Sequence, residues 1–127
     1  MKYSYKTNGT CSVKIDFDVT DGIVSNVKFV GGCNGNLKGI SSLVEGMPVE
    51  EVIKRLHFTK CFVGADGFSV RNGLTASDFD TARINQLVVA ESEKRILLAD
   101  TSKAGKASVI HYAPIESVDT LVTNKWL

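Results

Sequence analysis

A short, uninterrupted apolar run, Ile96-Leu97-Leu98-Ala99, most constrains how this chain can fold. Charged residues flank it on both sides, and such a run is typical of a strand buried on both faces of a sheet. The run leads into Asp100-Thr101-Ser102-Lys103, so a carboxylate, hydroxyls and an ammonium leave the carboxyl end of that strand together. Open α/β sheets bind ligands at this edge, where Lys103 would suit a phosphate and Asp100 a sugar hydroxyl. A strand followed by a solvated turn is the simpler interpretation, and these few residues alone favour it.

The composition is that of an ordinary soluble globular chain, and it disfavours several classes of function. The 127 residues are 43% hydrophobic and 23% charged, with a net charge of +1, so no global field favours nucleic acid. No apolar run approaches membrane-spanning length, and the start of the chain lacks the apolar core of a signal peptide. Three cysteines, an odd number, suggest free thiols in a reducing compartment. We therefore expect a cytoplasmic protein without a membrane partner.

Alternating apolar and polar residues mark a strand early in the chain. Every odd residue from Cys11 to Val19 is apolar and the residues between them are polar, which is the pattern of a half-buried strand. We expect this strand to begin earlier, near Tyr3–Lys6. Asp21-Gly22 is a hairpin turn signal, and a second strand is expected to follow over Ile23–Val30.

Two helices are predicted after this hairpin. A glycine-rich turn leads into apolar residues at helical spacing over Leu37–Val44, and Gly46 is placed to end that helix. Pro48 then opens a second helix, whose apolar face runs from Val49 to Leu56.

The turn before the first helix is a candidate site for an anion or a reactive thiol, because a helix N-terminus stabilises negative charge. Its residues are Gly32, Cys33, Asn34 and Gly35. A tight turn with a small buried thiol is the alternative, and we favour it over nucleophilic catalysis because no histidine is near in sequence.

In the second half, the sequence predicts the order strand, helix, strand, turn and strand, which is typical of a partly parallel α/β sheet. We expect a strand over Lys60–Val63, a turn at Gly73–Thr75, and then a helix that runs to about Ser92. Ser77 or Asp78 can cap that helix, and Ile84, Leu87, Val88 and Glu91 mark one side of it. After the central strand, Pro114 opens a helical turn and Thr120–Thr123 forms a last strand.

The segment Tyr3–Leu56 resembles the TSCPD-domain family, a module also found in some ribonucleotide reductases. The matching segments are Tyr5–Ser12, Val30–Leu37, Gly39-Ile40 and Leu43–Gly46. That family continues into a further cysteine and a Thr-Ser-Cys-Pro-Asp string, which this chain does not contain. A tetrahedral metal site needs four ligands, so Cys11 and Cys33 alone do not predict one, and we expect no metal and no cofactor.

The segment Phe58–Thr123 resembles the carboxyl part of the sensor domain of DeoR-type transcriptional repressors. The matching motifs are Phe62–Ser69, Gly73-Leu74-Thr75, Leu97–Lys103, Ala113–Ile115 and Val118–Thr123. The resemblance implies a pocket for a sugar phosphate or another phosphorylated small molecule. The ligand-binding residues it implies are Gly64, Asp66, Gly67, Asp100, Ser102 and Lys103. A full repressor begins with a winged helix-turn-helix and a further half of the sensor, neither of which is recognised here, so we expect no direct DNA binding.

The two resemblances meet near His57 and predict a mixed α/β protein with two modules. Residues 1–57 form a hairpin and two-helix module, residues 58–127 form an α/β half-domain, and we expect both to pack as one unit. The favoured function is non-enzymatic binding of a sugar phosphate by a recombined or chimeric small domain, with homo-oligomers allowed. The alternatives are a TSCPD protein associated with ribonucleotide reductase and a chimeric scaffold with no evolved ligand. No catalytic residues are predicted, because His57 and His111 lack a sequence-local acid, base or nucleophile.

Overall fold

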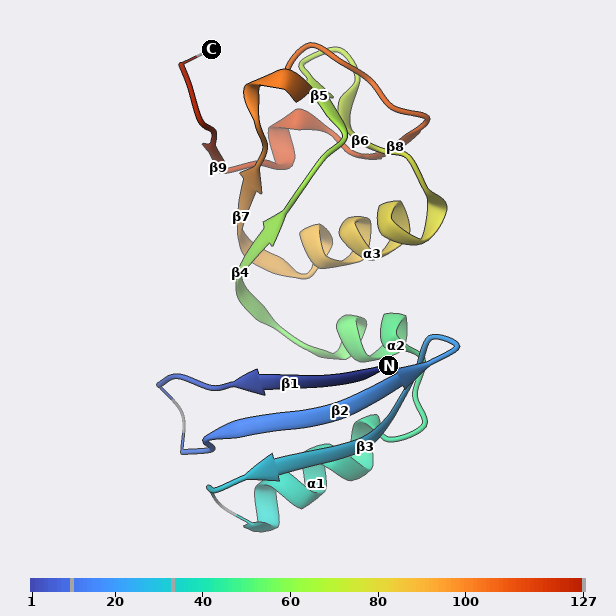
Figure 1. The fold of residues 1–127 in the computed structure, drawn as a ribbon, viewed down its shortest axis with the longest axis vertical. Helices are drawn as coiled ribbons and strands as arrows, with labels where there is room; N and C mark the ends of the chain where they lie inside the picture. The colour runs from blue at the N-terminus through green and yellow to red at the C-terminus, as the bar shows by residue number, and fades with distance from the viewer. Residues whose placement is uncertain (10, 33, 127) are drawn as a thin grey trace. The chain divides into compact units, whose positions relative to one another are not determined.

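A computed structural model describes residues 1–9, 11–32 and 34–126, with the backbone alone at residues 34–36. The chain divides into two compact units, Met1–Val52 and Ile53–Leu127, which are described separately below (Figure 1). The predicted division lay at residue 57, a few residues further along the chain. That the two units unfold together stays a prediction.

The first unit is an antiparallel three-stranded sheet followed by helices. Its elements are β1 (Lys2–Lys6), β2 (Lys14–Thr20), β3 (Ile23–Val30), α1 (Asn34–Val44) and α2 (Val49–Arg55), the last of which runs across the division between the units. The hairpin β2–β3 is confirmed: Thr20 pairs with Ile23 across Asp21 and Gly22, whose φ angles are 51° and 75°. Positive φ at both turn residues matches the right-handed twist of the flanking strands.

The predicted first strand is wrong in one respect, because it is two strands rather than one. β1 pairs antiparallel with β2, with Lys2 opposite Asp18 and Lys6 opposite Lys14. The alternation that begins at Cys11 is ordered as a strand only from Lys14. Val13 is 57% exposed, so the apolar pattern extended past the residues that the sheet pairs.

A bulge in β3 connects this sheet to the end of α1. The register shifts by one residue opposite Phe17, and Asn26 takes a left-handed φ of 51° there. The Glu45 carboxylate, directly after α1, accepts hydrogen bonds from the amides of Asn26 (2.6 Å) and Val27 (3.2 Å). The predicted end of α1 is confirmed, since Gly46 has a φ of 74° one residue further on.

The second unit contains two three-stranded sheets, one parallel and one antiparallel. Its elements are β4 (Phe58–Val63), β5 (Gly67–Ser69), β6 (Gly73–Ala76), α3 (Phe79–Ala90), β7 (Ser92–Leu98), η1 (Thr101–Lys103), β8 (Ile110–Ala113), η2 (Ile115–Ser117) and β9 (Thr120–Val122). The parallel sheet has the order β4-β7-β9, so the apolar run lies on its central strand, as predicted (Figure 1). Ile96 and Leu97 are buried, but Leu98 is 46% exposed, so full burial of the run was wrong at its end.

The predicted turn at Gly73–Thr75 is instead the buried strand β6. It pairs with β5 on one side and β8 on the other, and all four of its residues are buried. The turn lies just before it, at residues 70–72, between β5 and β6. Gly73 carries a left-handed φ of 64°, so the glycine marks the beginning of the strand rather than the turn itself.

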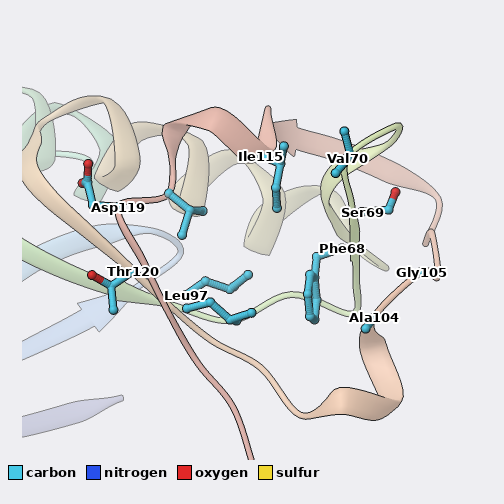
Figure 2. A pocket seen from close by; sticks show the side chains of 11 residues that line it. Phe68, Ser69, Val70, Leu97, Ala104, Gly105, Ile115, Asp119 and Thr120 are labelled. Atoms are coloured by element: carbon cyan, nitrogen blue, oxygen red, sulfur yellow. The ribbon is translucent and has the colours of Figure 1, made fainter. Parts of the chain in front are cut away.

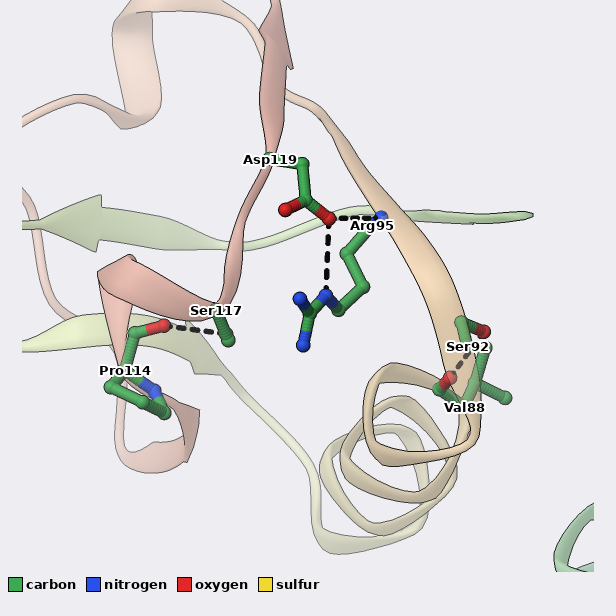
Figure 3. Close-up of polar contacts among 6 residues, drawn as sticks. All are labelled: Val88, Ser92, Arg95, Pro114, Ser117 and Asp119. Carbon is green, nitrogen blue, oxygen red and sulfur yellow. Dashed lines mark hydrogen bonds and ion pairs between the residues drawn. The ribbon is translucent and has the colours of Figure 1, made fainter. Parts of the chain in front are cut away.

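The helix α3 contacts both sheets of the second unit and completes its core. Asp78, one of the two caps that the sequence allowed, is the N-cap, and its carboxylate accepts a hydrogen bond of 2.8 Å from the amide of Thr81. Its buried residues are Ala82 and Val89, whereas the predicted apolar side is only half-buried at Ile84, Leu87 and Val88. Figure 3 shows the junction with β7, where the Ser92 hydroxyl donates to the Val88 carbonyl at 2.6 Å.

The start of β9 is held to β7 by an ion pair within the sheet (Figure 3). One oxygen of Asp119 accepts from the Arg95 amide at 2.7 Å and from its Nε at 3.1 Å. These hydrogen bonds, together with the guanidinium charge, hold the pKa of Asp119 below its ordinary value.

The helices and sheets of the two units confirm the predicted mixed α/β fold class. None of the helices in the described residues is long and apolar enough to cross a membrane.

Candidate functional site

An open pocket of about 430 Å³ lies where β4 and β7 end. Val63 pairs with Leu97, so the segments that follow these parallel neighbours leave the sheet side by side. The pocket is lined by Gly64, Ala65, Asp66, Ala76, Thr81, Asn85, Leu98, Ala99, Asp100 and Lys103. Four of the six ligand-binding residues predicted for this half of the chain therefore line one pocket: Gly64, Asp66, Asp100 and Lys103.

Asp66 is fixed to the β6 segment through both its backbone and its side chain. Its amide donates to the Thr75 carbonyl at 2.9 Å, and one of its carboxylate oxygens, Oδ2, accepts from the Ser77 amide at 2.8 Å. These bonds position the carboxylate at the pocket wall without using its other oxygen.

Asp100 also lines the pocket, and hydrogen bonding favours its ionised form. Its Oδ1 accepts a hydrogen bond of 2.7 Å from the Ser102 amide, so the carboxylate caps η1. Hydrogen bonding from Ser102, with the nearby charges of Lys103 and Lys106, keeps the pKa of Asp100 below its ordinary value. An ionised carboxylate only accepts hydrogen bonds, which suits the hydroxyl groups of a ligand.

The other two predicted residues, Gly67 and Ser102, do not line the pocket. Gly67 begins β5 and is buried, and a Cβ there would lie 2.5 Å from the carbonyl oxygen of Lys106. Ser102 is exposed, and its amide serves as the donor to Asp100. Ser102 therefore contributes to the pocket through Asp100, which lines it.

Sequence reasoning missed the lining residues contributed by α3 and the end of β6. Thr81 and Asn85 are four residues apart and so lie on the same side of α3, and Ala76 ends β6. The polar side chains of Thr81 and Asn85, on an otherwise apolar side of α3, were the available signal. To use that signal, one must know which side of α3 meets the carboxyl ends of β4 and β7.

Two buried hydroxyls hold the loops around the pocket. Tyr112 is 3% exposed, and its phenol donates a hydrogen bond of 2.6 Å to the Gly64 carbonyl. Burial, with smaller effects of Cys61 and Asp66, raises the pKa of Tyr112 to about 12. The buried Thr75 hydroxyl donates to the Gly67 carbonyl at 2.9 Å and accepts from the Ser108 amide at 2.8 Å.

The candidate thiol site in the first unit is only partly described. Gly32 has a φ of 87°, and a Cβ there would lie 2.9 Å from the Leu37 side chain, so this position requires glycine. α1 begins at Asn34, earlier than the predicted start near Leu37, so Asn34 and Gly35 belong to the helix rather than to the turn before it. Cys33 lies outside the described residues, as do the side chains of residues 34–36. Its reactivity stays a prediction.

The histidines and acidic residues show no second chemical centre in the described part of the chain. His57 pairs with Glu93 at 2.8 Å, and both side chains are more than half exposed. Across residues 1–9, 11–32 and 34–126, no group of three or more His, Cys, Asp or Glu side chains could hold a metal ion.

Comparison with known proteins finds related sequences for most of this chain. Residues 24–125 match the model of the DeoR C terminal sensor domain. The HTH-type transcriptional regulator GlpR of Haloferax volcanii is 32% identical over 100 residues, which cover 79% of this chain and 38% of that protein. The HTH-type transcriptional repressor GlcR of Bacillus subtilis is 28% identical over 91 residues, covering 72% and 35%. The HTH-type transcriptional regulator IolR of Bacillus subtilis is 31% identical over 80 residues, covering 63% and 32%.

The match extends further toward the start of the chain than expected. It begins at residue 24, inside the segment Tyr3–Leu56 that resembles the TSCPD family. The TSCPD resemblance, and with it the idea of a recombined chain, stays a prediction. The chain spans between 32% and 38% of the length of the relatives described above.

Proposed function

This chain belongs to the DeoR C-terminal sensor domain family, and we propose that it binds a phosphorylated sugar as the effector of a transcriptional regulator. The relatives are transcriptional regulators rather than enzymes, which supports a role in sensing rather than in catalysis. The DeoR resemblance of Phe58–Thr123 supplies the ligand class.

One observation carries the proposal: Asp66, Asp100 and Lys103 converge on one pocket at the carboxyl edge of a parallel sheet. Ligands of open α/β sheets bind at that edge. Asp100 accepts hydrogen bonds from sugar hydroxyls, and Asp66 supplies a second acceptor in the same pocket. Lys103 provides the positive charge for the phosphate group.

The charges at the pocket indicate weak binding. Its described lining holds two carboxylates and one ammonium, so a phosphate dianion meets one attractive charge and two repulsive ones. Thr81 and Asn85 add neutral hydrogen-bonding groups, which suit the hydroxyl-bearing part of the ligand. The sugar hydroxyls therefore supply binding that the single ammonium does not.

The experiment is a titration of the chain with a panel of pentose and hexose phosphates, followed by amide chemical shifts. We expect shifts confined to Gly64–Gly67, to Asp100–Gly105 and to the first half of α3. Inorganic phosphate is the matched comparison, and it should shift the residues near Lys103 only. A panel that moves none of these amides at millimolar concentration would replace the sensor function with a scaffold that binds no sugar phosphate.

A further inference from the structure

A second hollow in the second unit is apolar and has no role in the proposed function. It has a volume of about 500 Å³ and reaches down to Leu97 and Phe68, which are 1% and 5% exposed (Figure 2). The apolar side chains that line it are Phe68, Val70, Leu97, Ile115, Val118 and Leu121. Pockets of this size hold a whole small ligand, so an aromatic side chain fits within it.

The rim of this hollow is unusually apolar for a surface in water. Val70 at the rim is 83% exposed, and Leu121 is 37% exposed. Figure 2 shows the side chains of Phe68 and Leu97 at its base and Ile115 above them. An apolar surface that extends from the core to solvent is typical of a contact with another apolar group.

The chain presents a large apolar group close by in sequence. Trp126, the single tryptophan of the chain, is fully exposed. It follows β9, whose residues Thr120 and Leu121 line the hollow. The Asn124 side chain accepts a hydrogen bond of 3.0 Å from the amide of Thr101, which anchors the segment before Trp126 beside η1. The next residues after η1, Ala104 and Gly105, form another part of the rim.

We propose that the hollow receives Trp126 of a second copy of this chain, in a reciprocal exchange between two molecules. A two-fold contact closes only when the donor and acceptor groups lie on the same patch of each molecule. The anchored segment before Trp126 and the rim residues after η1 meet this condition. Lys125, next to the tryptophan, is also opposite in charge to Asp119 at the rim, where the pair with Arg95 uses one carboxylate oxygen, Oδ2.

The exchanged contact is small, so the dimer is weak. A buried tryptophan removes roughly 150–250 Å² from water, and two of them fall well short of the ~1,200 Å² of a standard stable interface. The dimer should therefore form only as the concentration rises through the micromolar range and above.

The test uses the fluorescence of the single tryptophan in the whole chain, from micromolar to millimolar concentration. We expect the emission maximum to move to shorter wavelength as concentration rises, in step with dimer formation measured by sedimentation velocity. Trp126→Ala should sediment as a monomer throughout. Val70→Asp should remove both the emission shift and the dimer, and Val70→Lys should do the same with the opposite charge.

Val109→Asp is the matched control, because Val109 is 85% exposed and does not line the hollow. It should behave as the wild type does. An emission maximum that stays at the exposed position at every concentration would refute the exchange. A short-wavelength maximum independent of concentration would show that each Trp126 fills its own hollow, which also overturns the proposal. Equal effects of the Val70 and Val109 variants would place the contact on another surface.

Discussion

The phenol of Tyr112 on β8 donates a hydrogen bond of 2.6 Å to the carbonyl oxygen of Gly64, the first residue after β4. This bond connects the antiparallel sheet to the loop that forms one wall of the candidate sugar-phosphate pocket. The backbone of Asp66 is held two residues later by the Thr75 carbonyl. The pocket wall is therefore positioned by the second sheet rather than by the parallel strands alone.

Removing the Tyr112 hydroxyl should destabilise the second unit. Tyr112→Phe keeps the buried ring but leaves the Gly64 carbonyl without its donor, and an unsatisfied buried group costs about 1–3 kcal/mol. Urea denaturation at neutral pH measures the loss. An unchanged free energy of unfolding would mean that water replaces the phenol at Gly64.

The same pair predicts how stability changes at high pH. The pKa of Tyr112 is raised from 10.0 to about 12, so the folded state favours the neutral phenol. The unfolded chain ionises first as pH rises above 10, and stability due to this group is lost progressively until the pH reaches about 12. The wild type should therefore lose more stability between these pH values than Tyr112→Phe does. Parallel denaturation curves of both proteins at pH values below and within this window provide the measurement.

Lys103 should control phosphate affinity at the candidate pocket. Lys103→Ala removes the ammonium that lines the pocket, so binding of a sugar phosphate should fall at least tenfold, beyond measurable concentrations for a weak site. Lys106→Ala is the matched control, because Lys106 lies in the same segment but does not line the pocket. Equal losses in both variants would indicate a general charge effect rather than contact with the ligand.

Asp100 should control recognition of the sugar rather than of the phosphate. Asp100→Asn keeps the shape and an acceptor for the Ser102 amide but removes the negative charge that accepts from hydroxyls. Sugar phosphates should bind several-fold more weakly, whereas inorganic phosphate should bind as well or better because a repulsive charge is gone. Titrations of both ligands, followed by amide shifts, distinguish the two effects. Weaker binding of inorganic phosphate would contradict the role assigned to Asp100.

The sequence predicted the turns and helix ends that depend on a few neighbouring residues. Asp21-Gly22, the N-cap Asp78 and the glycine after α1 were each identified from neighbouring sequence and are confirmed. The strand β6 was mistaken for a turn because Gly73 and the short run after it carry turn chemistry. Its strand state depends on pairing with β5 and with β8, and the β8 residues are more than 30 positions away. Long-range pairing of this kind leaves no local signal.

The lining of the candidate pocket was predictable where one segment carries its polar residues. Asp100 and Lys103 were proposed from the apolar strand that they follow, whereas Asp66 was proposed only through the resemblance to DeoR-type sensors, and all three line the pocket. Thr81 and Asn85 were missed because the side of α3 that meets the pocket is set by packing against both sheets. Gly67 and Ser102 were assigned to the ligand by their place in a motif; they do not line the pocket, and their contact with a ligand stays a prediction.

The buried Thr75 hydroxyl should matter for stability more than its size suggests. Thr75→Val preserves the shape but leaves both the Gly67 carbonyl and the Ser108 amide without a partner, so a loss of about 2 kcal/mol is expected. Thr75→Ser retains the hydroxyl and should recover most of that loss. Thermal and urea unfolding of the pair measure the difference, and equal stability of the two variants would show that the hydroxyl bridge contributes nothing.

The close approach of two chain segments at Gly67 gives the last prediction. A Cβ at Gly67 would lie 2.5 Å from the Lys106 carbonyl oxygen and 3.0 Å from the Ala107 amide nitrogen, both of which are backbone atoms. Gly67→Ala should therefore push the segment after η1 away from β5 and cost about 1–3 kcal/mol. Gly64→Ala is the matched control, because its Cβ would meet only the Leu98 carbonyl, at an ordinary 3.8 Å. Because Gly67 directly follows the pocket residue Asp66 without lining the pocket itself, Gly67→Ala should also weaken sugar-phosphate binding while the protein remains folded at low temperature.

Equal stability of the two alanine variants in denaturation curves would contradict this prediction. It would mean that the segment after η1 can move away from β5 at no cost in free energy, and that Gly67 does not hold the pocket in shape.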